Sequence, residues 1–223
     1  MERLLILETS QKVGTVALAE GERVRAERRL EEARRHARDL APYARDLLAE
    51  QGWTARDLAG VVVSLGPGSY TGLRVGVMSA KALAYATGAA LIGVETFAPL
   101  ALQAPEDAPL VDVLEDAQQG RVYVQRFERS EGVLRAAAPL RILSFAEWAA
   151  QAPPGLCATG PGLALHRTAP PGVTLTTEDH WRPAAASLLR LALPRLRAGE
   201  RDDLYRLEPL YLRPSEAEQK WRR

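Results

Sequence analysis

The amino-acid sequence predicts an α/β protein made of two similarly built halves, each with a mixed sheet. Apolar runs typical of strands alternate with amphipathic segments typical of helices along the chain. A pattern of strand, polar loop, strand and turn near the start of the chain returns from Leu110 onward. Between them, the proline-containing segment 103–109 is typical of a linker. We therefore expect an N-terminal lobe over 1–104 and a C-terminal lobe over 105–223.

The first half opens with three extended segments in a row. The apolar run Leu4 to Leu7 ends at the polar residues Glu8-Thr9-Ser10, and a second apolar run covers 14–19. A turn at 20–22 leads into a third segment that begins at Arg23. Short strands joined by tight turns predict an antiparallel meander.

Helices and parallel strands are expected to complete the first half. The later elements are, in order, a helix over 36–51, a buried strand over 61–63, a helix over 71–87, a strand over 90–94 and a helix over 97–103. The first helix has one apolar stripe, and Pro42 must lie in its first turn or kink it. Gly88 ends the second helix.

The second half repeats the meander with strands over 110–114 and 121–127 and a turn at 130–132. The elements expected after it are a helix over 144–152 with Ser144 as N-cap and Glu147 at N3, strands over 156–158 and 173–175, and a helix over 184–198. Each half has an acidic residue at the end of its first strand, Glu8 and Asp116. We interpret the repetition as an internal duplication, and chance similarity is the alternative.

Composition excludes several classes of protein. The 223 residues carry a formal net charge of +1, which argues against a nucleic-acid coat or a polybasic membrane binder. The single cysteine, Cys157, excludes an internal disulfide framework and multi-cysteine metal sites, and we expect it in the core. The apolar run after Met1 is too short for a secretion signal, and no stretch approaches the ~20 apolar residues of a membrane span. We expect a cytoplasmic protein.

The strongest local motif is a glycine-rich turn that joins the strand at 61–63 to the next helix. It consists of Gly66, Pro67, Gly68, Ser69, Tyr70, Thr71, Gly72, Leu73 and Arg74, and we call it the signature turn. Glycines permit a tight turn, and free amides at the start of a helix bind anions. The motif matches neither a dinucleotide fingerprint nor a Walker A loop. A capped strand–helix junction and an anion site are both compatible with it.

Polar residues at strand ends provide further candidates for anion or nucleotide binding. They are Glu8, Thr9, Ser10, Asp116, Gly160 and Gly162. The two acids could face one cleft and hold a metal–phosphate complex, while the glycines allow a nucleotide near the backbone. As alternatives, the acids and hydroxyls form local turns and the glycines are turn residues.

Two other patterns concern partners and metals. The helix over 71–87 has a face of small residues, typical of close packing within the chain or against another chain. These are Gly72, Gly76, Ser79, Ala80 and Ala84. His36, His166 and His180 lack metal-ligand spacing, and we expect surface or capping roles for them. No Gly-x-Ser-x-Gly nucleophile motif is present.

Taken together, these motifs resemble the bacterial TsaB family, also called YeaZ-like, over most of the chain. The matching segments are Glu8-Thr9-Ser10, His36 to Pro42, Gly66 to Arg74, Gly93-Val94, Asp116-Ala117 with Val122-Tyr123, and Pro209 to Pro214. The resemblance implies an actin-like, Hsp70-like ATPase fold with two duplicated lobes. It also implies a part in forming threonylcarbamoyladenosine in tRNA.

For catalysis, the resemblance implies a non-catalytic subunit. The related catalytic subunit, TsaD, holds its metal through a His-x-x-x-His pair, and 94–100, where that pair would fall, contains no histidine. Relatives often have arginine where this chain has Gln118, and most have aspartate at Glu8. Loss of the arginine removes a phosphate donor. We expect no required cofactor or metal, with ATP or ADP binding as an alternative.

For partners, the resemblance implies a heterodimer with TsaD, addition of the ATPase TsaE, a homodimer, and contact with tRNA through the complex. The residues assigned to this interface are Leu40, Ala44, Leu47, Leu73, Val77, Ala80 and Ala84. Ala80→Arg is accordingly expected to block pairing without unfolding the chain. A stand-alone ATPase or kinase of the same fold and a peptidase remain as alternatives.

Overall fold

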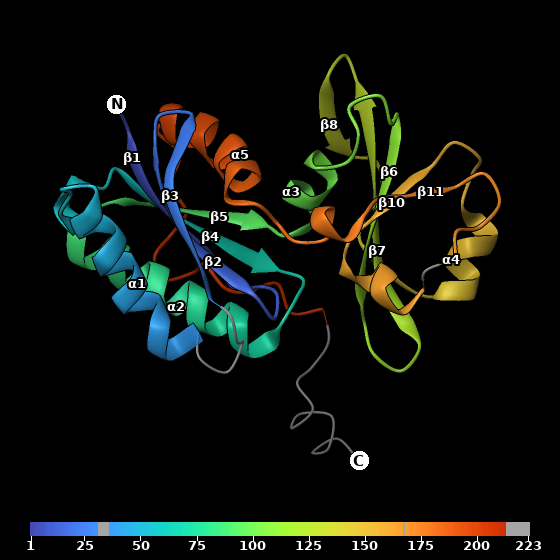
Figure 1. Ribbon diagram of the computed structural model, residues 1–223, viewed down its shortest axis with the longest axis horizontal. Coiled ribbons are helices and arrows are strands. Elements are labelled where there is room, and N and C mark those ends of the chain that lie inside the picture. Colours follow the sequence, from blue (N-terminus) through green and yellow to red (C-terminus); the bar gives the residue numbers. More distant parts are fainter. Residues whose placement is uncertain (31–35, 167, 213–223) are drawn as a thin grey trace. The chain divides into compact units, whose positions relative to one another are not determined.

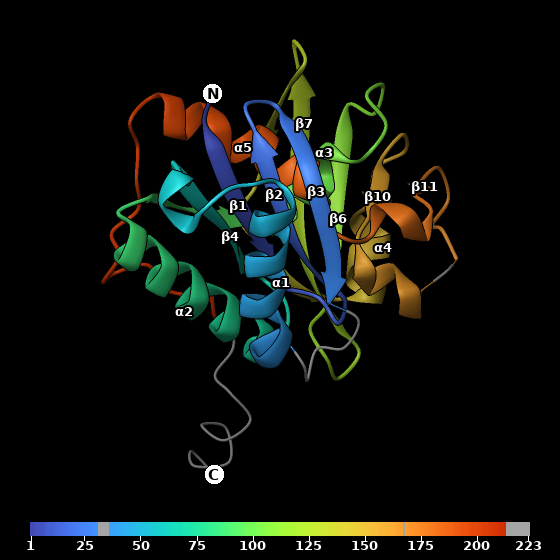
Figure 2. The ribbon, with the colours of Figure 1, turned by 60° about the vertical axis from the view of Figure 1, so that its left-hand side comes forward.

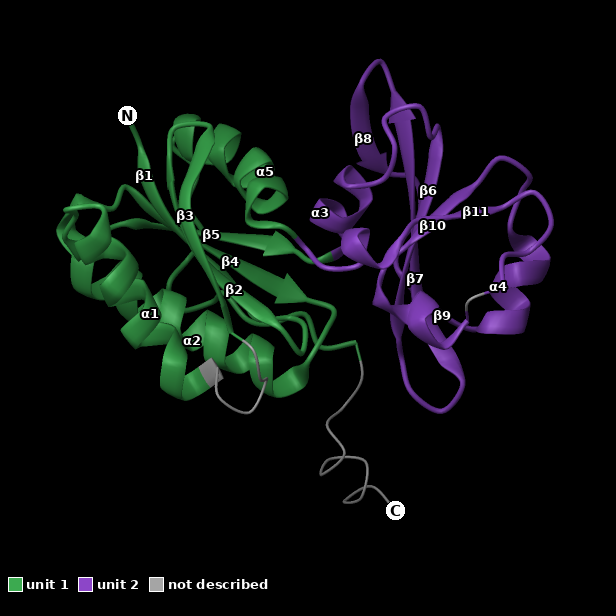
Figure 3. Ribbon diagram, in the orientation of Figure 1, with its two compact units in different colours: residues 1–96, 184–223 green, residues 97–183 purple. Residues whose placement is uncertain are grey.

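The computed structural model describes residues 1–30, 36–166 and 168–212, which form two compact units. Unit 1 comprises Met1–Thr96 and Ala184–Arg223, and unit 2 comprises Phe97–Pro183, as Figure 3 shows. The sequence predicts a single boundary at 104/105, and the structure divides the chain differently. Helix α3 (Phe97–Leu102) packs into the core of unit 2, while the last helix, α5 (Ala185–Arg197), returns to unit 1.

Unit 1 contains a five-stranded mixed sheet in the order β3-β2-β1-β4-β5. The strands are β1 (Arg3–Glu8), β2 (Gly14–Glu20), β3 (Arg23–Leu30), β4 (Gly60–Gly66) and β5 (Ala90–Glu95). The first three pair antiparallel, and β4 and β5 extend the sheet in parallel from β1. The predicted meander and the two predicted parallel strands are therefore confirmed.

Helices cover both faces of this sheet (Figures 1 and 2). Helices α1 (His36–Glu50) and α2 (Tyr70–Thr87) pack against the face that carries Leu5 and Leu7. Helix α5 packs against the opposite face, with Leu4 and Ile6. Because successive side chains of a strand point to opposite faces, the single apolar run of β1 contributes to both cores. A short 3-10 helix at Ala55–Asp57 precedes β4.

Unit 2 repeats the sheet of unit 1, in the order β11-β10-β6-β7-β8 with β9 also paired to β7. Its strands are β6 (Leu110–Asp116), β7 (Arg121–Ser130), β8 (Val133–Ala136), β9 (Arg141–Ser144), β10 (Cys157–Thr159) and β11 (Thr174–Leu175). Here too, three antiparallel strands are followed by two parallel ones. The two sheets share order and direction, which confirms the predicted duplication of α/β lobes.

Local signals in unit 2 predict its helices well and one strand poorly. Helix α4 (Phe145–Gln151) begins with the predicted capping box of Ser144 and Glu147. Short 3-10 helices lie at Pro161–Leu165 and Glu178–His180. Strand β9 was not expected, because its four residues are exposed or half-buried and lack an apolar alternation. None of the helices in the described ranges is long and apolar enough to cross a membrane.

Candidate functional site

The signature turn lies at the end of β4 and leads directly into α2. Ser69 caps the helix, because its Oγ accepts a hydrogen bond from the Gly72 amide at 3.2 Å. At the other end of α2, Gly88 adopts the left-handed conformation with φ 76°. β1 and β4 are neighbours in the sheet, so the loop at Glu8, Thr9 and Ser10 lies beside the signature turn. The structure thus brings two separate sequence motifs together in unit 1.

Three glycines let α2 and the signature turn press against that loop. A Cβ atom added at Gly68, Gly72 or Gly76 would lie closer than 3.0 Å to an atom of Ser10 or Thr9. At Gly72 the atom met is the backbone oxygen of Thr9, and at Gly76 it is the Thr9 hydroxyl oxygen. Real Cβ atoms essentially never approach so closely. The small face of α2 therefore serves packing within the chain.

Glu8 points inward and is sealed from solvent. Its Oε1 accepts hydrogen bonds from the Ser10 amide at 2.6 Å and the Ser10 hydroxyl at 2.5 Å. The other oxygen, Oε2, is buried and has no hydrogen-bond partner among the described residues. Burial raises the pKa of Glu8 to about 7, against the bonds from Ser10 and Ser64, which favour the charged form.

The remaining polar groups of the loop are also turned inward. Ser10 donates both its amide and its hydroxyl to Glu8, and its carbonyl accepts from the Ser69 amide at 2.6 Å. The Thr9 amide donates to the Ser64 hydroxyl at 3.3 Å, and both of these side chains are fully buried. An anion could reach these donors only by displacing the internal bonds. This geometry favours the local-turn reading of Glu8, Thr9 and Ser10 over phosphate binding.

The candidate residues of unit 2 also have local roles. Asp116 is exposed, and its Oδ1 accepts from the Gln118 amide at 2.7 Å, which is the geometry of a turn-forming aspartate. Gly160 has φ 107°, and Cβ atoms at Gly160 and Gly162 would lie closer than 3.0 Å to the backbone of β6 at Leu114 and Glu115. These glycines therefore let the backbone at 160–162 approach the backbone of β6, both within unit 2.

The seven residues assigned to a partner interface are all buried in unit 1. They are Leu40, Ala44, Leu47, Leu73, Val77, Ala80 and Ala84, and each is at most 4% exposed. Six of them, all but Leu73, belong to the core that α1 and α2 form with the sheet of the same chain, which corrects the expectation that they face a partner. Ala80→Arg would therefore bury an unpaired guanidinium, and we expect unfolding from it rather than selective loss of pairing.

The outer, exposed face of α2 carries a different set of apolar residues. Met78 is 64% exposed and Tyr85 is 73% exposed. Between them on the helix, the Lys81 ammonium donates to the carbonyl oxygens of Tyr205 and Leu207 at 3.3 and 3.2 Å. These bonds hold the C-terminal segment 202–212 along α2, where Tyr205 is 80% exposed. We call Met78, Tyr85 and Tyr205 the outer apolar patch.

The same C-terminal segment ends against the signature turn. The Leu210 amide donates to the Leu65 carbonyl at 2.8 Å. The Tyr211 ring lies 4.7 Å from the Tyr70 ring, and its hydroxyl accepts from Arg74 Nε at 2.9 Å. The Arg74 guanidinium also lies over the Tyr70 ring at 4.3 Å. The exposed end of the signature turn thus binds the chain's own tail, a contact that no local sequence signal indicates.

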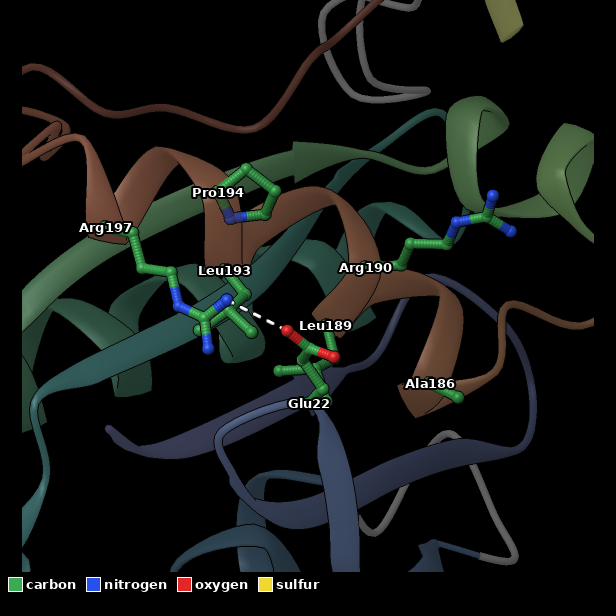
Figure 4. A pocket seen from close by; sticks show the side chains of 7 residues that line it. All are labelled: Glu22, Ala186, Leu189, Arg190, Leu193, Pro194 and Arg197. Carbon is green, nitrogen blue, oxygen red and sulfur yellow. Dashed lines mark hydrogen bonds and ion pairs between the residues drawn. The ribbon is translucent and has the colours of Figure 1, made fainter. Parts of the chain in front are cut away.

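A cavity of about 420 Å³ lies elsewhere on unit 1, between α5 and the β2–β3 turn (Figure 4). It is lined by Glu22, Ala186, Leu189, Arg190, Leu193, Pro194 and Arg197. Arg197 donates to Glu22 at 3.0 Å and to Glu2 at 3.2 Å, so its charge is balanced within the protein. None of the sequence-predicted candidates lines this cavity.

The histidines of unit 2 make structural contacts. The His166 ring stacks on Phe145 at 3.8 Å, and His180 Nδ1 lies 3.0 Å from the Thr177 hydroxyl. In the ranges that the structure covers, no group of three or more histidine, cysteine, aspartate or glutamate residues is arranged to hold a metal ion.

Sequence reasoning missed a buried polar cluster in unit 2. Asp112 on β6 is 1% exposed, and its carboxylate accepts two bonds from Arg126, at 2.8 Å each, and one from Trp148 Nε1 at 2.9 Å. The Asp112 carboxylate raises the pKa of Arg126. An aspartate inside an otherwise apolar strand run is the signal that could have indicated this cluster.

Comparison with known proteins gives a consistent result. A family model for TsaD, described as tRNA N6-adenosine threonylcarbamoyltransferase, matches residues 30–176. The tRNA threonylcarbamoyladenosine biosynthesis protein TsaB of Bacillus subtilis is 29% identical, over 98% of this chain and 97% of that protein. An uncharacterised Pseudomonas aeruginosa structure, described as similar to the peptidase YeaZ, superimposes with a TM-score of 0.80 at 30% identity, covering 96% of this chain and all of that one. YeaZ from the same organism gives 0.79 at 28% identity, with 95% and 100% covered.

The two sheets of corresponding strand order and the signature turn therefore define a protein with the fold of the YeaZ structures. The chain belongs to the TsaB family, which takes part in the synthesis of threonylcarbamoyladenosine in tRNA.

Proposed function

We propose that this chain is a non-catalytic subunit that binds TsaD and supports its transfer of threonylcarbamoyl to tRNA. The observation that carries the proposal is the outer apolar patch, Met78, Tyr85 and Tyr205, on a chain of the TsaB family. Large apolar side chains that project from a rigid helix are typical of protein–protein contacts, and tyrosine is frequent at energetically important positions. The inward-turned polar groups of the Glu8 loop give no support to a separate nucleotide-dependent activity.

The proposed docking surface replaces the residues that the sequence favoured and keeps one of the two helices that carry them, α2. Val77, Ala80 and Ala84 hold α2 to the sheet, and the opposite side of the helix is free to meet a partner. The bonds from Lys81 fix the C-terminal segment beside that side, so Tyr205 adds to the same surface. A homodimer through this patch, addition of TsaE to the heterodimer, and tRNA contact through the complex are further parts of the proposal.

Met78→Asp and Tyr85→Asp are expected to raise the Kd for the TsaD of the same genome by about 30-fold each, since central interface side chains contribute on the order of 2 kcal/mol. In the complex, the new carboxylate would be buried in an apolar contact, which opposes binding. In the free chain both positions are exposed, so the substitutions leave folding unchanged. Calorimetric titration gives the Kd, and light scattering on size-exclusion fractions gives the stoichiometry.

Leu165→Asp is the matched control, because Leu165 is 66% exposed and lies in unit 2. Its Kd is expected to equal that of the unchanged chain. If Met78→Asp and Tyr85→Asp bind TsaD as tightly as this control, the surface is wrongly assigned. Turnover of ATP by the isolated chain would favour the stand-alone ATPase instead.

A further inference from the structure

The C-terminal segment 202–212 is fastened to the sheet of unit 1 near both of its ends. At its start, the Asp202 amide donates to the Leu91 carbonyl of β5 at 2.8 Å, and the Asp202 carboxylate accepts from a second amide of that strand at 2.6 Å. At its end, the Leu210 amide donates to the Leu65 carbonyl of β4 at 2.8 Å. Between these points the segment runs beside α2 (Figure 2). Fixing both ends leaves the backbone between them few alternative conformations.

The middle of this segment forms a tight turn around Tyr205. Asp203 Oδ1 accepts from the amides of Tyr205 at 2.7 Å and Arg206 at 3.1 Å. The Asp203 carbonyl oxygen accepts from the Leu207 amide at 2.9 Å. An aspartate that binds the backbone amides two and three residues further on is typical of a local turn. Leu204 and Leu207 pack against the core of α1 and α2, so the turn is also anchored by apolar contacts.

Lys81 joins this turn, residues 203–207, to α2, and we call these residues the tyrosine turn. The Lys81 ammonium donates to the carbonyl oxygens of Tyr205 at 3.3 Å and Leu207 at 3.2 Å. Two bonds to carbonyls on either side of the turn fix the orientation of the backbone that carries Tyr205. The Tyr205 side chain itself is 80% exposed. Tyrosine offers a large contact area with few rotatable bonds, so an exposed tyrosine on a fastened turn is well suited to anchor a protein–protein contact.

We propose that the tyrosine turn is a preformed docking element for TsaD, with Tyr205 as the side chain that enters the contact and with Lys81 and Asp203 as positioning residues that fix it before binding. This inference rests on the proposed function and assigns roles to two residues that act on the partner only through Tyr205. An anchor that is ordered beforehand loses less conformational entropy on association. The apparent Kd therefore rises as the fraction of molecules with a closed turn falls.

Amide hydrogen exchange of the full chain tests the positioning roles without TsaD. Lys81→Met removes both bonds from α2 to the turn, and Asp203→Ala removes the two bonds to its own side chain. In each variant, exchange of the amides at 205–207 is expected to quicken by about fivefold. Lys81→Arg and Asp203→Asn keep a donor and an acceptor, and Lys12→Met removes an exposed lysine elsewhere in unit 1, so these three are expected to exchange like the unchanged chain. Unchanged exchange in Lys81→Met or in Asp203→Ala would overturn the role of that residue.

A double-mutant cycle with TsaD tests whether Lys81 acts through Tyr205. Calorimetric titration is expected to give a Kd about 30-fold higher for Tyr205→Ala and about fivefold higher for Lys81→Met. Because Lys81 only places the ring, Lys81→Met is expected to cause no further rise in a chain that already carries Tyr205→Ala. Lys81→Arg is expected to retain the Kd of the unchanged chain. Equal fold-changes in both backgrounds would overturn the inference, since a direct contact of Lys81 with TsaD would weaken binding with or without the ring.

This inference and the proposed function fail in different ways. If Met78→Asp weakens TsaD binding and Tyr205→Ala does not, the proposed function stands and the tyrosine turn has no part in it. If the unchanged chain does not bind TsaD, the proposed function fails and the docking role of the turn fails with it. Urea denaturation checks that each variant is folded, and Asp203→Ala replaces Lys81→Met in the cycle if Lys81→Met does not fold.

Discussion

Asp112→Ala is expected to lower the free energy of unfolding by about 3–5 kcal/mol, because it leaves a guanidinium and an indole N–H without their shared acceptor. Asp112 is 1% exposed in the middle of β6 and accepts three hydrogen bonds, two from Arg126 and one from Trp148. The Arg126 side chain is 27% exposed, so solvent compensates part of the loss on that side. Urea denaturation followed by tryptophan fluorescence and circular dichroism measures the change.

Asp116→Ala is the control for Asp112→Ala, because Asp116 is exposed and bonds only to its own turn. It is expected to change stability by less than about 1 kcal/mol. The double variant Asp112→Leu with Arg126→Met should recover much of the loss, since a buried ion pair can be replaced by apolar groups of similar size. A loss below about 1 kcal/mol for Asp112→Ala would show that the cluster does not stabilise unit 2.

Hydrophobic patterning predicted the architecture of this chain because it is a local property. The meander, both parallel strand pairs and the cap at Ser144 follow from residue types within a few positions of one another. The repeated pattern from Leu110 onward predicted the duplicated sheet for the same reason. Where the last helix packs depends on which apolar face remains uncovered. For α5 that is the Leu4 and Ile6 face of unit 1, and no local pattern in the sequence encodes it.

The candidate site shows a second limit of sequence reasoning. Glycine, serine and threonine at a strand–helix junction suit both a phosphate and a closely packed loop, because both need small residues and free donors. The adjacency of β1 and β4 favours the packed loop, since it places Thr9 and Ser10 against Gly72 and Gly68. Likewise, the stripe that includes Ala80 indicates which face of α2 is buried. It does not indicate whether a sheet or another chain buries it.

Gly72→Ala is expected to destabilise the protein, although two opposing contributions to the free energy of unfolding, helix propensity and packing, act at this position. Alanine is favoured over glycine inside a helix by about 1 kcal/mol, so propensity alone predicts a more stable protein. The new Cβ would lie closer than 3.0 Å to the backbone oxygen of Thr9, which cannot rotate away. Overpacking of this kind costs about 1–3 kcal/mol or more, and we expect a net loss of stability in urea denaturation.

Two companion variants separate packing from propensity. Ala82→Gly, at an exposed position of α2, is expected to lose about 1 kcal/mol through propensity alone. Gly76→Ala meets the hydroxyl oxygen of Thr9, so the additional substitution Thr9→Ala should restore stability to Gly76→Ala but not to Gly72→Ala. Rescue of both would place the obstacle in the Thr9 side chain, and rescue of neither would show that the Thr9 hydroxyl is not the obstacle at Gly76. Only selective rescue agrees with the close packing of Gly72 on the backbone, and of Gly76 on the hydroxyl, of Thr9 in the loop of Glu8.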